Sequence, residues 1–463
     1  MPGKRASFSF VESESGSRLL ASVSDAPIKV KPTVKEIPLS RPNGDMILQQ
    51  EIEDHGDEIR TALMDHPEIA KVLSQIDLAP NAENWNLLFG ISSPFGEAVR
   101  WEVLRNAVPD HLALSLGRRL FRIAADPASP ELGIRHFPDR LRFVAVLSPA
   151  GVPCRPEFDA LVAAAERGRT AGLPLDLLMY VGDRDLLQIA PDWATCKLMP
   201  ASTTELQDEL RAARGHLVHF FCHGQSEFPQ ALQFATVAEQ RAKESEGSVL
   251  LSMDRIVEAH LIDAAWLVVF NCCDGGRPGK ALGSMAYRAV AEAGVPAAIG
   301  MGSPLPSGAA PLFSAALYGS LFKGLADIMP AVANSAVEVD FGEPIAEARC
   351  GLHQAITSSG VPFSCWSLPI IYLNRKQFIV QKTFGESLPA GRTDGPLPQP
   401  APPDPLIIRK RIATIAGMLQ SMPATTPRAV RQQMIQLFDE DPVVPPALRC
   451  DEYGAFPGSG DRQ

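Results

Sequence analysis

From residue 140 to residue 372 the hydrophobic positions form short continuous runs, separated by longer segments with helical spacing. Short apolar runs are typical of buried strands, and we predict strands at residues 142–147, 175–180, 217–222, 267–271, 297–301 and 369–372. The segments between them carry apolar residues on one helical face, which predicts helices at residues 157–167, 282–293, 309–322 and 329–339. This alternation predicts an α/β fold with a mainly parallel sheet flanked by helices.

The N-terminal part of the chain has a different pattern. Residues 6–11 and 18–23 alternate apolar and polar positions on either side of a Glu-Ser-Gly-Ser turn, which predicts a hairpin. Residues 54–76 have helical spacing. We therefore predict an extended N-terminal segment with a hairpin and a helical part at residues 1–79, followed by the main domain at residues 80–385.

A proline-rich linker is predicted after the main domain, at residues 386–405. A small helical module at residues 406–450 and a flexible tail at residues 451–463 complete the chain. The first helix of the module has an apolar stripe formed by Ile407, Ile408, Ile412, Ile415, Met418 and Leu419. The same stripe would suit a helix packed on the main domain or a docking module, so both interpretations stay open.

The composition is that of an ordinary soluble globular protein, with 463 residues, 46% of them hydrophobic and 21% charged. The net charge of −10 and the pI near 5.5 argue against a protein that binds nucleic acid directly. The first 25 residues contain no long apolar run, and no segment approaches the ~20 apolar residues of a membrane helix. Eight irregularly spaced cysteines fit reduced thiols, so we expect a cytoplasmic protein without membrane contact.

Two of the predicted strands end in chemically active residues. Residues 217–222 lead into His223-Gly224, and residues 267–271 lead into a segment with Cys273-Asp274-Gly275. In an open α/β sheet, functional residues gather at the carboxyl ends of the strands. His223 and Cys273 can therefore meet although 50 positions (273 − 223) separate them, and this is the arrangement of a cysteine-nucleophile hydrolase. The alternative for each residue alone is a buried core position.

The neighbouring histidine and cysteines suggest a competing zinc site. His219, Cys222, His223, Cys272 and Cys273 are all zinc ligands by residue type. Adjacent strand residues point to opposite faces, however, and no C-x₂-C pair is present. His219 shares a face with His223 but lies deeper, which favours a structural hydrogen bond. We expect no metal and no cofactor.

The glycine-rich segment at residues 275–281 lies where a phosphate-binding loop would be found. Asp274 occupies the position of the first P-loop glycine, and Ala281 replaces the hydroxyl residue that would bind magnesium. These differences exclude nucleotide hydrolysis. We expect the loop residues Gly224, Asp274 and Gly275 to keep the site open, with backbone N–H groups as candidate oxyanion donors.

Taken together, these motifs resemble the CHAT domain, a caspase-like peptidase family related to separases. The family's aromatic-x-x-His-Gly pattern matches Phe220 to Gly224, and its nucleophile strand matches Phe270 to Gly275, with Cys273 on the cysteine of the family and Cys272 on its alanine. The resemblance covers residues 80–380, including Trp101-Glu102 near its beginning. It departs from the family in Asp274, which replaces glutamate, in Gly302-Ser303-Pro304, which replaces a tryptophan segment, and in the lack of preceding helical repeats.

The resemblance implies a caspase-like sheet and a cytosolic cysteine endopeptidase that cuts a protein partner through a Cys–His dyad. It further implies a role in bacterial defence or stress signalling, with a gasdermin-like effector as substrate and an activating protein or ligand sensor as switch. Two other functions remain open: a catalytically silent CHAT scaffold for protein binding, and a cysteine-dependent hydrolase of small amides. Glycine-rich rims suited to an extended peptide favour the endopeptidase over the amide hydrolase.

Three carboxylates follow strand ends near the predicted site: Asp183, Asp185 and Asp274. A carboxylate in a partly desolvated substrate pocket pairs well with a basic side chain, and pairs bidentately with arginine. We therefore predict cleavage after Arg or Lys. The alternative is that these acids cap helices or lie in solvent, in which case the pocket could be apolar.

Overall fold

The computed structural model describes residues 3–13, 18–39, 46, 48–79, 83–108, 110–124, 134–225, 230–272, 284–359, 361–374 and 378–382. The chain divides into two units, Met1–Phe384 and Gly385–Gln463. The predicted linker, helical module and tail belong to the second unit and lie outside the described residues. The same is true of Cys273, Asp274 and Gly275.

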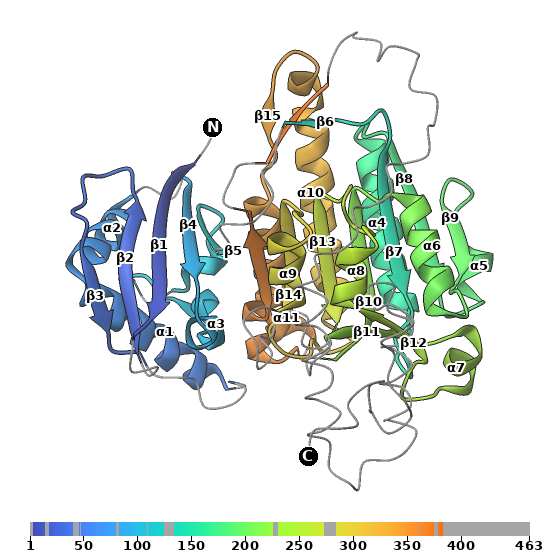
Figure 1. The fold of residues 1–463 in the computed structure, drawn as a ribbon, viewed down its shortest axis with the longest axis horizontal. Coiled ribbons are helices and arrows are strands. Elements are labelled where there is room, and N and C mark those ends of the chain that lie inside the picture. The colour runs from blue at the N-terminus through green and yellow to red at the C-terminus, as the bar shows by residue number, and fades with distance from the viewer. Residues whose placement is uncertain are drawn as a thin grey trace, which may run out of the picture. The chain divides into compact units, whose positions relative to one another are not determined.

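One sheet runs through the described part of the first unit, with the strand order β3-β2-β1-β4-β5-β16-β14-β13-β10-β7-β8-β9 (Figure 1). Its central and C-terminal strands are β7 Leu141–Leu147, β8 Leu175–Val181, β9 Thr195–Leu198, β10 Leu217–Gln225, β13 Leu267–Cys272, β14 Ala297–Met301 and β16 Pro369–Leu373. Those of them that are adjacent in the sheet pair in parallel, except that β14 and β16 are antiparallel. The predicted α/β class with a mainly parallel sheet is confirmed.

The N-terminal strands extend the same sheet. They are β1 Lys4–Glu12, β2 Leu19–Asp25, β3 Val34–Ile37, β4 Trp85–Ile91 and β5 Arg118–Ala124. The predicted hairpin is present as the antiparallel pair β1 and β2, and β1 also pairs in parallel with β4. Because β4 pairs with β5 and β5 with β16, backbone hydrogen bonds continue from the N-terminal hairpin to the central strands. The region before residue 80 also contains helices α1 Gln49–Met64 and α2 Pro67–Leu78.

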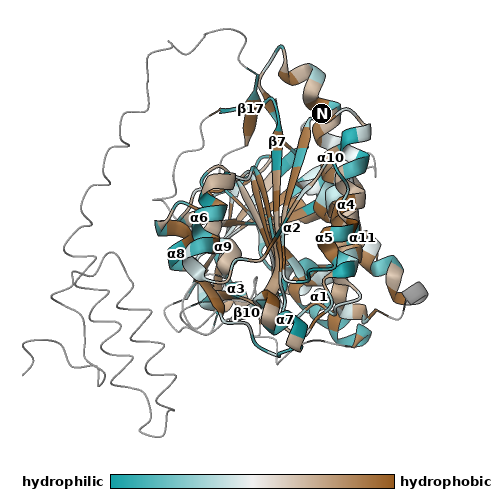
Figure 2. Cartoon of the chain, turned by 90° about the vertical axis from the view of Figure 1, so that its right-hand side faces the viewer, coloured by the Kyte–Doolittle hydropathy of each residue, from teal (hydrophilic) through white to brown (hydrophobic). Residues whose placement is uncertain are grey.

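Helices cover both faces of the central strands, and each face has its own hydrophobic core. One core includes side chains of α4 Arg155–Thr170, α10 Ala310–Val332 and α11 Gly342–Ser359. The other includes side chains of α6 Thr203–Ala213, α8 Met253–Glu258 and α9 Met285–Ala291. Strand residues contribute to the two cores alternately, as Phe143 and Val144 do. Figure 2 shows the result, with mostly hydrophobic central strands between helices that are polar on part of their surface.

Short elements complete the described fold. The hairpin β11 Ala231–Phe234 and β12 Val249–Ser252 attaches to β10. A separate small sheet contains β6 Arg135–His136, β15 Val337–Glu338 and β17 Ile379–Gln381. The helix predicted at residues 329–339 is wrong, because its first residues continue α10 and Val337–Glu338 pairs with β17. The remaining helices are α3 Pro94–Ala98, α5 Leu186–Ile189 and α7 Val237–Ala242, with 3₁₀ turns at Trp101–Val103, Leu112–Leu114 and Phe363–Ser367.

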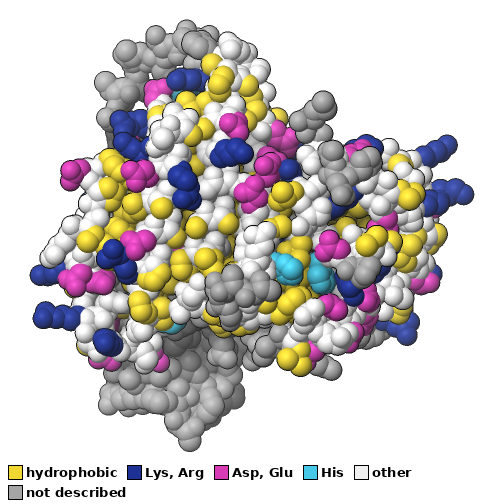
Figure 3. Space-filling model, turned by 180° about the vertical axis from the view of Figure 1, so that it is seen from behind, with side chains coloured by type: hydrophobic (Ala, Val, Ile, Leu, Met, Phe, Trp, Pro, Cys, Tyr) yellow, Lys and Arg dark blue, Asp and Glu magenta, His cyan; other side chains and the backbone are white. Residues whose placement is uncertain are grey.

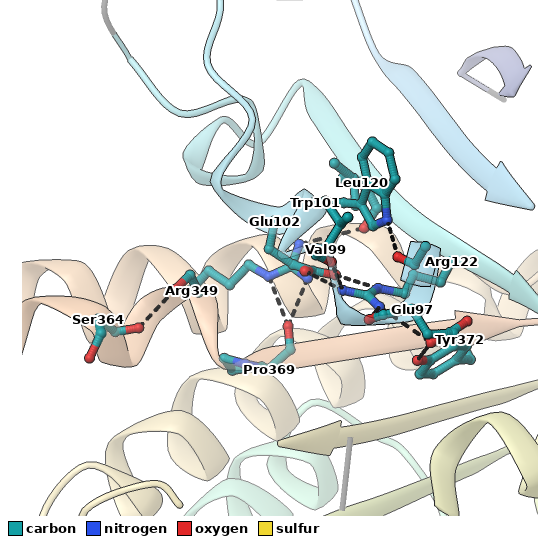
Figure 4. Close-up of polar contacts among 12 residues, drawn as sticks. Glu97, Val99, Trp101, Glu102, Leu120, Arg122, Arg349, Ser364, Pro369 and Tyr372 are labelled. Carbon is teal, nitrogen blue, oxygen red and sulfur yellow. Dashed lines mark hydrogen bonds and ion pairs between the residues drawn. The ribbon is translucent and has the colours of Figure 1, made fainter. Parts of the chain in front are cut away.

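A buried charge cluster lies where the N-terminal strands join the central sheet (Figure 4). Arg122 on β5 donates to both carboxylate oxygens of Glu102, at 3.0 and 2.8 Å, and to Glu97 Oε2 at 3.3 Å. Its remaining N–H groups donate to the carbonyls of Glu97 and Val99, at 2.9 and 3.0 Å. The Tyr372 hydroxyl on β16 donates to Glu97. These bonds link α3, the 3₁₀ turn Trp101–Val103 and β5 to one another and to β16, whose Tyr372 lies 275 positions after Glu97.

A candidate cysteine–histidine site at the ends of β10 and β13

The two strands that carry the candidate dyad are direct neighbours in the sheet. β10 and β13 pair in parallel, with Phe221 opposite Asn271 and Cys222 opposite Cys272. These are the residues that precede His223 and Cys273 in the chain. The described part of β13 therefore ends beside the backbone that carries His223, while the position of Cys273 itself stays a prediction.

β10 continues further than the sequence predicted. The strand was expected to stop before His223 and to turn at Gly224, but it extends to Gln225. The reason is the antiparallel partner β11, whose Gln233 lies opposite His223 and whose Leu232 lies opposite Gly224. His223 is thus held in a strand with backbone partners on its β11 side, which limits the movement of its Cα. Gly224 lies in the same strand and not in a turn.

The imidazole of His223 is oriented by a backbone carbonyl. Its Nε2 lies 2.7 Å from the oxygen of Ala150, in the connection between β7 and α4. A carbonyl oxygen can only accept a hydrogen bond, so Nε2 must be the donor. In the neutral ring the proton then lies on Nε2, and Nδ1 carries the lone pair. The side chain of His223 is partly exposed, so this lone pair belongs to a ring that solvent or a substrate can reach.

The connection that presents Ala150 is itself fixed from several sides. Ser148 N–H donates to the carbonyl of Phe221 at 3.0 Å, and Ala235 N–H donates to the carbonyl of Ser148 at 2.9 Å. A Cβ on Gly182, which follows β8, would lie 2.4 Å from Ser148 Oγ, so a side chain there would displace the Ser148 hydroxyl. Gly151 has a φ of +67°, in the left-handed region that favours glycine. The acceptor of His223 is therefore set by the fold before any substrate binds.

A second polar cluster lies deeper on the same face of the sheet. His219 is fully buried, with Nδ1 3.0 Å from the Tyr318 hydroxyl and Nε2 3.0 Å from Glu157 Oε1, the latter at an angle unsuited to a hydrogen bond. Glu157 Oε1 also accepts a bond from Asn271 Nδ2 at 3.2 Å and one from the Ser314 hydroxyl. The predicted deeper position of His219 and its hydrogen bond are confirmed, and its mainly structural role stays a prediction. Burial, with the Glu157 carboxylate nearby, raises the pKa of Tyr318 well above its usual range.

The other candidate zinc ligands do not converge. Cys222 and Cys272 are 4% and 5% exposed and belong to the core on the opposite face, with Phe220 and Phe270. His219 is occupied by Glu157 and Tyr318 on its own face. Within the described ranges, no three His, Cys, Asp or Glu side chains form a group that could bind a metal ion.

Several described cysteines are poor nucleophiles. Burial raises the pKa of the Cys154 thiol to about 12, and the carboxylates of Asp183 and Glu157 add to the shift. Burial also raises the pKa of Cys196 and of Cys365 to about 11. Since the thiolate is the reactive form, these three thiols are almost entirely protonated at neutral pH.

Two of the predicted specificity residues, Asp183 and Asp185, lie after β8, at the same edge of the sheet as His223, and the third, Asp274, lies outside the described residues. Asp183 is half-buried, and its Oδ1 accepts a 3.0 Å bond from the backbone N–H of Asp185, which forms a local turn. Asp185 is exposed at the start of α5 and makes no capping bond with its side chain. Asp183 is thus committed to its own loop, and the predicted contact with a basic substrate side chain stays a prediction.

A pocket of about 50 Å³ lies elsewhere in the sheet, among residues of β1, β4, β5 and the segment around β15. Its charged lining residues are Arg5, Glu338 and Asp340, and Arg5 forms an ion pair with Glu338. The space suffices for a few water molecules. Leu373 of β16 also lines it, and β14 and β13 lie between β16 and β10 in the sheet, so this pocket is not part of the candidate site.

The surface seen in Figure 3 carries acidic and basic side chains in a mixed arrangement, and neither sign forms a broad patch on that face. Among the described residues, none of the helices combines the length and the apolar character needed to cross a membrane.

Comparison with known proteins gives a family match and distant structural similarities. Residues 190–339 match the family model of the CHAT domain, a range that contains His223 and Cys273. No curated protein matches the sequence. Two crystal structures of the Saccharomyces cerevisiae separase–securin complex are similar, at 12% and 10% identity and TM-scores of 0.34 and 0.32, over 70% and 71% of this chain. They match over 19% and 18% of the separase chain, so this chain spans about a fifth of its length.

A third similar structure is that of the Arg-specific cysteine proteinase gingipain R (RGPB). It has 10% sequence identity and a TM-score of 0.39, and the match covers 70% of this chain and 74% of the proteinase chain.

Ala150 and Glu157 lie outside the residues matched by the family model. Sequence reasoning also missed both residues as parts of the site.

Proposed function

We propose that this chain, which carries a CHAT domain at residues 190–339, is a cysteine endopeptidase that cuts a protein partner with Cys273 and His223. The observation that carries the proposal is the contact between His223 and Ala150. It leaves the Nδ1 lone pair of His223 available, on a strand whose direct neighbour β13 leads into Cys273. An imidazole oriented in this way is the partner that a cysteine thiol needs in order to react.

The proposed reaction has two steps. His223 Nδ1 takes the proton of the Cys273 thiol, and the thiolate attacks the carbonyl carbon of the scissile peptide bond. Backbone N–H groups of Gly224, Asp274 and Gly275 stabilise the oxyanion. When the C–N bond breaks, His223 returns the proton to the leaving amine. Water, deprotonated by Nδ1, then hydrolyses the thioester, which releases the acid and restores the thiol.

The Ala150 carbonyl supports both steps without taking a proton. It accepts the Nε2 proton of His223 throughout, so the ring keeps the tautomer in which Nδ1 acts as the base. When the ring is protonated as an imidazolium, the same carbonyl dipole stabilises its positive charge. A substitution of Ala150 that kept the backbone in place would leave this contact unchanged, because the acceptor belongs to the main chain.

The biological setting that we propose is bacterial defence or stress signalling in the cytoplasm. An activating protein or ligand would switch the peptidase on, and a gasdermin-like effector is one candidate substrate. A preference for Arg or Lys at the cleaved position is proposed from Asp183, Asp185 and Asp274. These statements rest on the resemblance and on the carboxylates near the site.

The test compares two adjacent cysteines. Wild type, Cys273→Ala and Cys272→Ala are each co-expressed with the products of neighbouring genes, and fragments are identified by mass spectrometry. The purified proteins are also treated with peptidyl acyloxymethyl ketones that carry Arg, Lys, Leu or Asp next to the reactive group. We expect cleavage and labelling to be lost in Cys273→Ala and kept in Cys272→Ala, since Cys272 belongs to the opposite core.

Two other results would change the interpretation. A label on Cys272 or Cys222 would show that the motif alignment is displaced by a residue or a strand. The absence of labelling and cleavage with every partner would favour the silent scaffold. Dominant labelling by the Leu or Asp ketone would contradict the basic preference alone and would leave the nucleophile assignment standing.

A further inference from the structure

The deep polar cluster beneath the candidate site has no part in the reaction proposed above. It consists of Glu157 on α4, His219 on β10, Asn271 on β13, and Ser314 and Tyr318 on α10. All five side chains are at most 2% exposed. It therefore joins the two strands of the candidate dyad to two helices that cover one face of the sheet.

Such a cluster is expensive to bury. A carboxylate loses its hydration in the interior, and the effective penalty is several kcal/mol even after relaxation. Glu157 Oε1 is well surrounded by Asn271, Ser314 and His219, but Oε2 is buried without a hydrogen-bond partner. Apolar side chains of similar volume would be as stable or more stable at such a position. The cluster is therefore poorly explained by stability alone.

The position of Asn271 connects the cluster with the nucleophile. Asn271 lies two positions before Cys273 in the chain, and its Nδ2 donates to Glu157 at 3.2 Å and contacts Ser314 Oγ at 3.4 Å. Both acceptors belong to helices, whose backbones are held by their own hydrogen bonds. The last described residues of β13 are thus anchored through the side chain of Asn271 as well as through the backbone pairing of the strand with β10.

The chain segment that contains Glu157 also contacts His223, the other residue of the proposed dyad. The β7–α4 connection presents the Ala150 carbonyl to His223, and seven positions later (157 − 150) the first turn of α4 presents Glu157 to Asn271. One continuous segment, anchored by the Ser148 bond to Phe221, contacts both β10 and β13. It can therefore set the position of the histidine strand relative to the cysteine strand.

We propose that Glu157 is a positioning residue of the peptidase site. It acts through Asn271 on the end of β13 and so sets where Cys273 begins relative to His223, an inference that rests on the proposed function. A misplacement of about 1 Å can lower a reaction rate on the order of 10²-fold. Loss of Glu157 should accordingly slow the attack by the thiol while leaving substrate binding nearly unchanged.

The test uses the full chain and needs no natural substrate. For Glu157→Ala, Glu157→Gln and wild type, we measure the maximal inactivation rate and the half-saturating concentration of a peptidyl acyloxymethyl ketone, together with the rate of Cys273 alkylation by iodoacetamide. Glu157→Ala should lower the maximal rate at least tenfold and shift the half-saturating concentration by less than about threefold. Glu157→Gln keeps an acceptor for Asn271 and should restore at least a third of the rate.

Glu97 provides the matched control, because it is an equally buried glutamate in the cluster around Arg122. Glu97→Ala should lower the thermal midpoint at least as much as Glu157→Ala, yet the folded protein should keep its maximal rate within about twofold. If Glu157→Ala fails to fold, Asn271→Ala and the double variant Glu157→Gln/Asn271→Ala take its place. The double variant should be no slower than Asn271→Ala alone, because residue 157 acts on β13 only through Asn271, which both variants lack.

The inference is overturned if Glu157→Ala reacts within twofold of wild type, if Glu157→Gln is no faster than Glu157→Ala, or if Glu97→Ala slows the reaction equally. Strictly additive losses in the double variant also overturn it. A wild type that reacts at Cys273 in any of these cases leaves the proposed function intact. A wild type that is neither labelled nor active refutes the proposed function, and the role of Glu157 with it.

Discussion

Two buried polar clusters, one around Arg122 and one around Glu157, contact different parts of the sheet, and they differ in the charged group at their centre. The cluster around Arg122 is centred on a guanidinium whose N–H groups all donate, to Glu97, Glu102 and the carbonyl of Val99. The cluster around Glu157 is centred on a carboxylate that uses one oxygen for three neighbours and leaves the other without a hydrogen bond. The first joins the N-terminal strands to the central sheet, and the second lies beneath the strand ends.

This difference indicates which of the two clusters contributes more to the stability of the fold. Arg122 pairs with two carboxylates and binds one of them, Glu102, bidentately, the geometry in which an arginine ion pair is strongest. Glu157 faces a histidine and neutral hydroxyl and amide groups, which give geometry but little charge compensation. We therefore assign stability mainly to the first cluster and site geometry mainly to the second.

The largest effect is expected from Arg122→Met. The change leaves Glu97 and Glu102 buried without their cation, and the free energy of unfolding should fall by about 3–5 kcal/mol. Urea unfolding at pH 7 measures it. Arg140→Met is the control, because Arg140 and Asp176 form an exposed pair that should contribute less than about 1 kcal/mol. Similar losses for both variants would show that the Arg122 cluster does not hold the two regions together.

The second prediction separates the two histidines of β10. His223→Ala should lower the rate of thiol labelling by a peptide electrophile on the order of 10²-fold or more. The thermal midpoint should hardly change, because the ring is partly exposed. His219→Ala should lower the free energy of unfolding by about 1–3 kcal/mol, since Tyr318 and Glu157 lose a buried partner.

Labelling kinetics and thermal unfolding of both variants test this separation. Equally large stability losses would indicate that His223 is as structural as His219. A chelator should have no effect on labelling by wild type. Activity that a chelator removes and zinc restores would revive the metal site and contradict the assignment of both histidines.

The smallest effect is a pH dependence carried by Glu97. Burial raises the pKa of Glu97 above its ordinary value of 4.5, against the opposing influence of Arg122. The native state therefore binds this proton more tightly than the unfolded chain. The contribution to the free energy of unfolding is present at low pH and is lost as the pH rises from about 4.5 through the raised pKa. Glu97→Gln should lack this decline.

Glu209 provides a control of opposite sign. Its bond to Lys197, assisted by the Tyr180 hydroxyl, lowers its pKa, so its contribution is present above its ordinary pKa and is lost on acidification. Unfolding measured from about pH 3 to about pH 8 should show the wild type losing stability relative to Glu97→Gln above about pH 4.5 and gaining it relative to Glu209→Gln as the pH rises toward about 4.5 and just above it. The same slope for both pairs would contradict the assignment for Glu97.

The sequence by itself determined the central strands and the chemical nature of the candidate site. Continuous apolar runs were enough to predict β7, β8, β10, β13, β14 and β16, because a strand buried on both faces needs apolar residues at every position. Apolar runs were not enough to predict β11 and β12, which have four residues each. These strands form because β11 pairs with the end of β10 from His223 onward, and β12 pairs with β11. β4 was also missed, although Trp85, Leu87, Phe89 and Ile91 alternate with less buried residues.

Only the tertiary structure decided which groups surround His223 and the described end of β13. His223 and Cys273 are visible in sequence because their side chains are reactive and follow apolar runs. The acceptor of His223 is a main-chain carbonyl 73 positions away, and a backbone atom leaves no trace in the residue type. Glu157 occupies the first turn of α4, where an acidic residue is expected at any helix N-terminus. Its contact with Asn271, 114 positions later, exists because the fold brings α4 against β13 and excludes water from both.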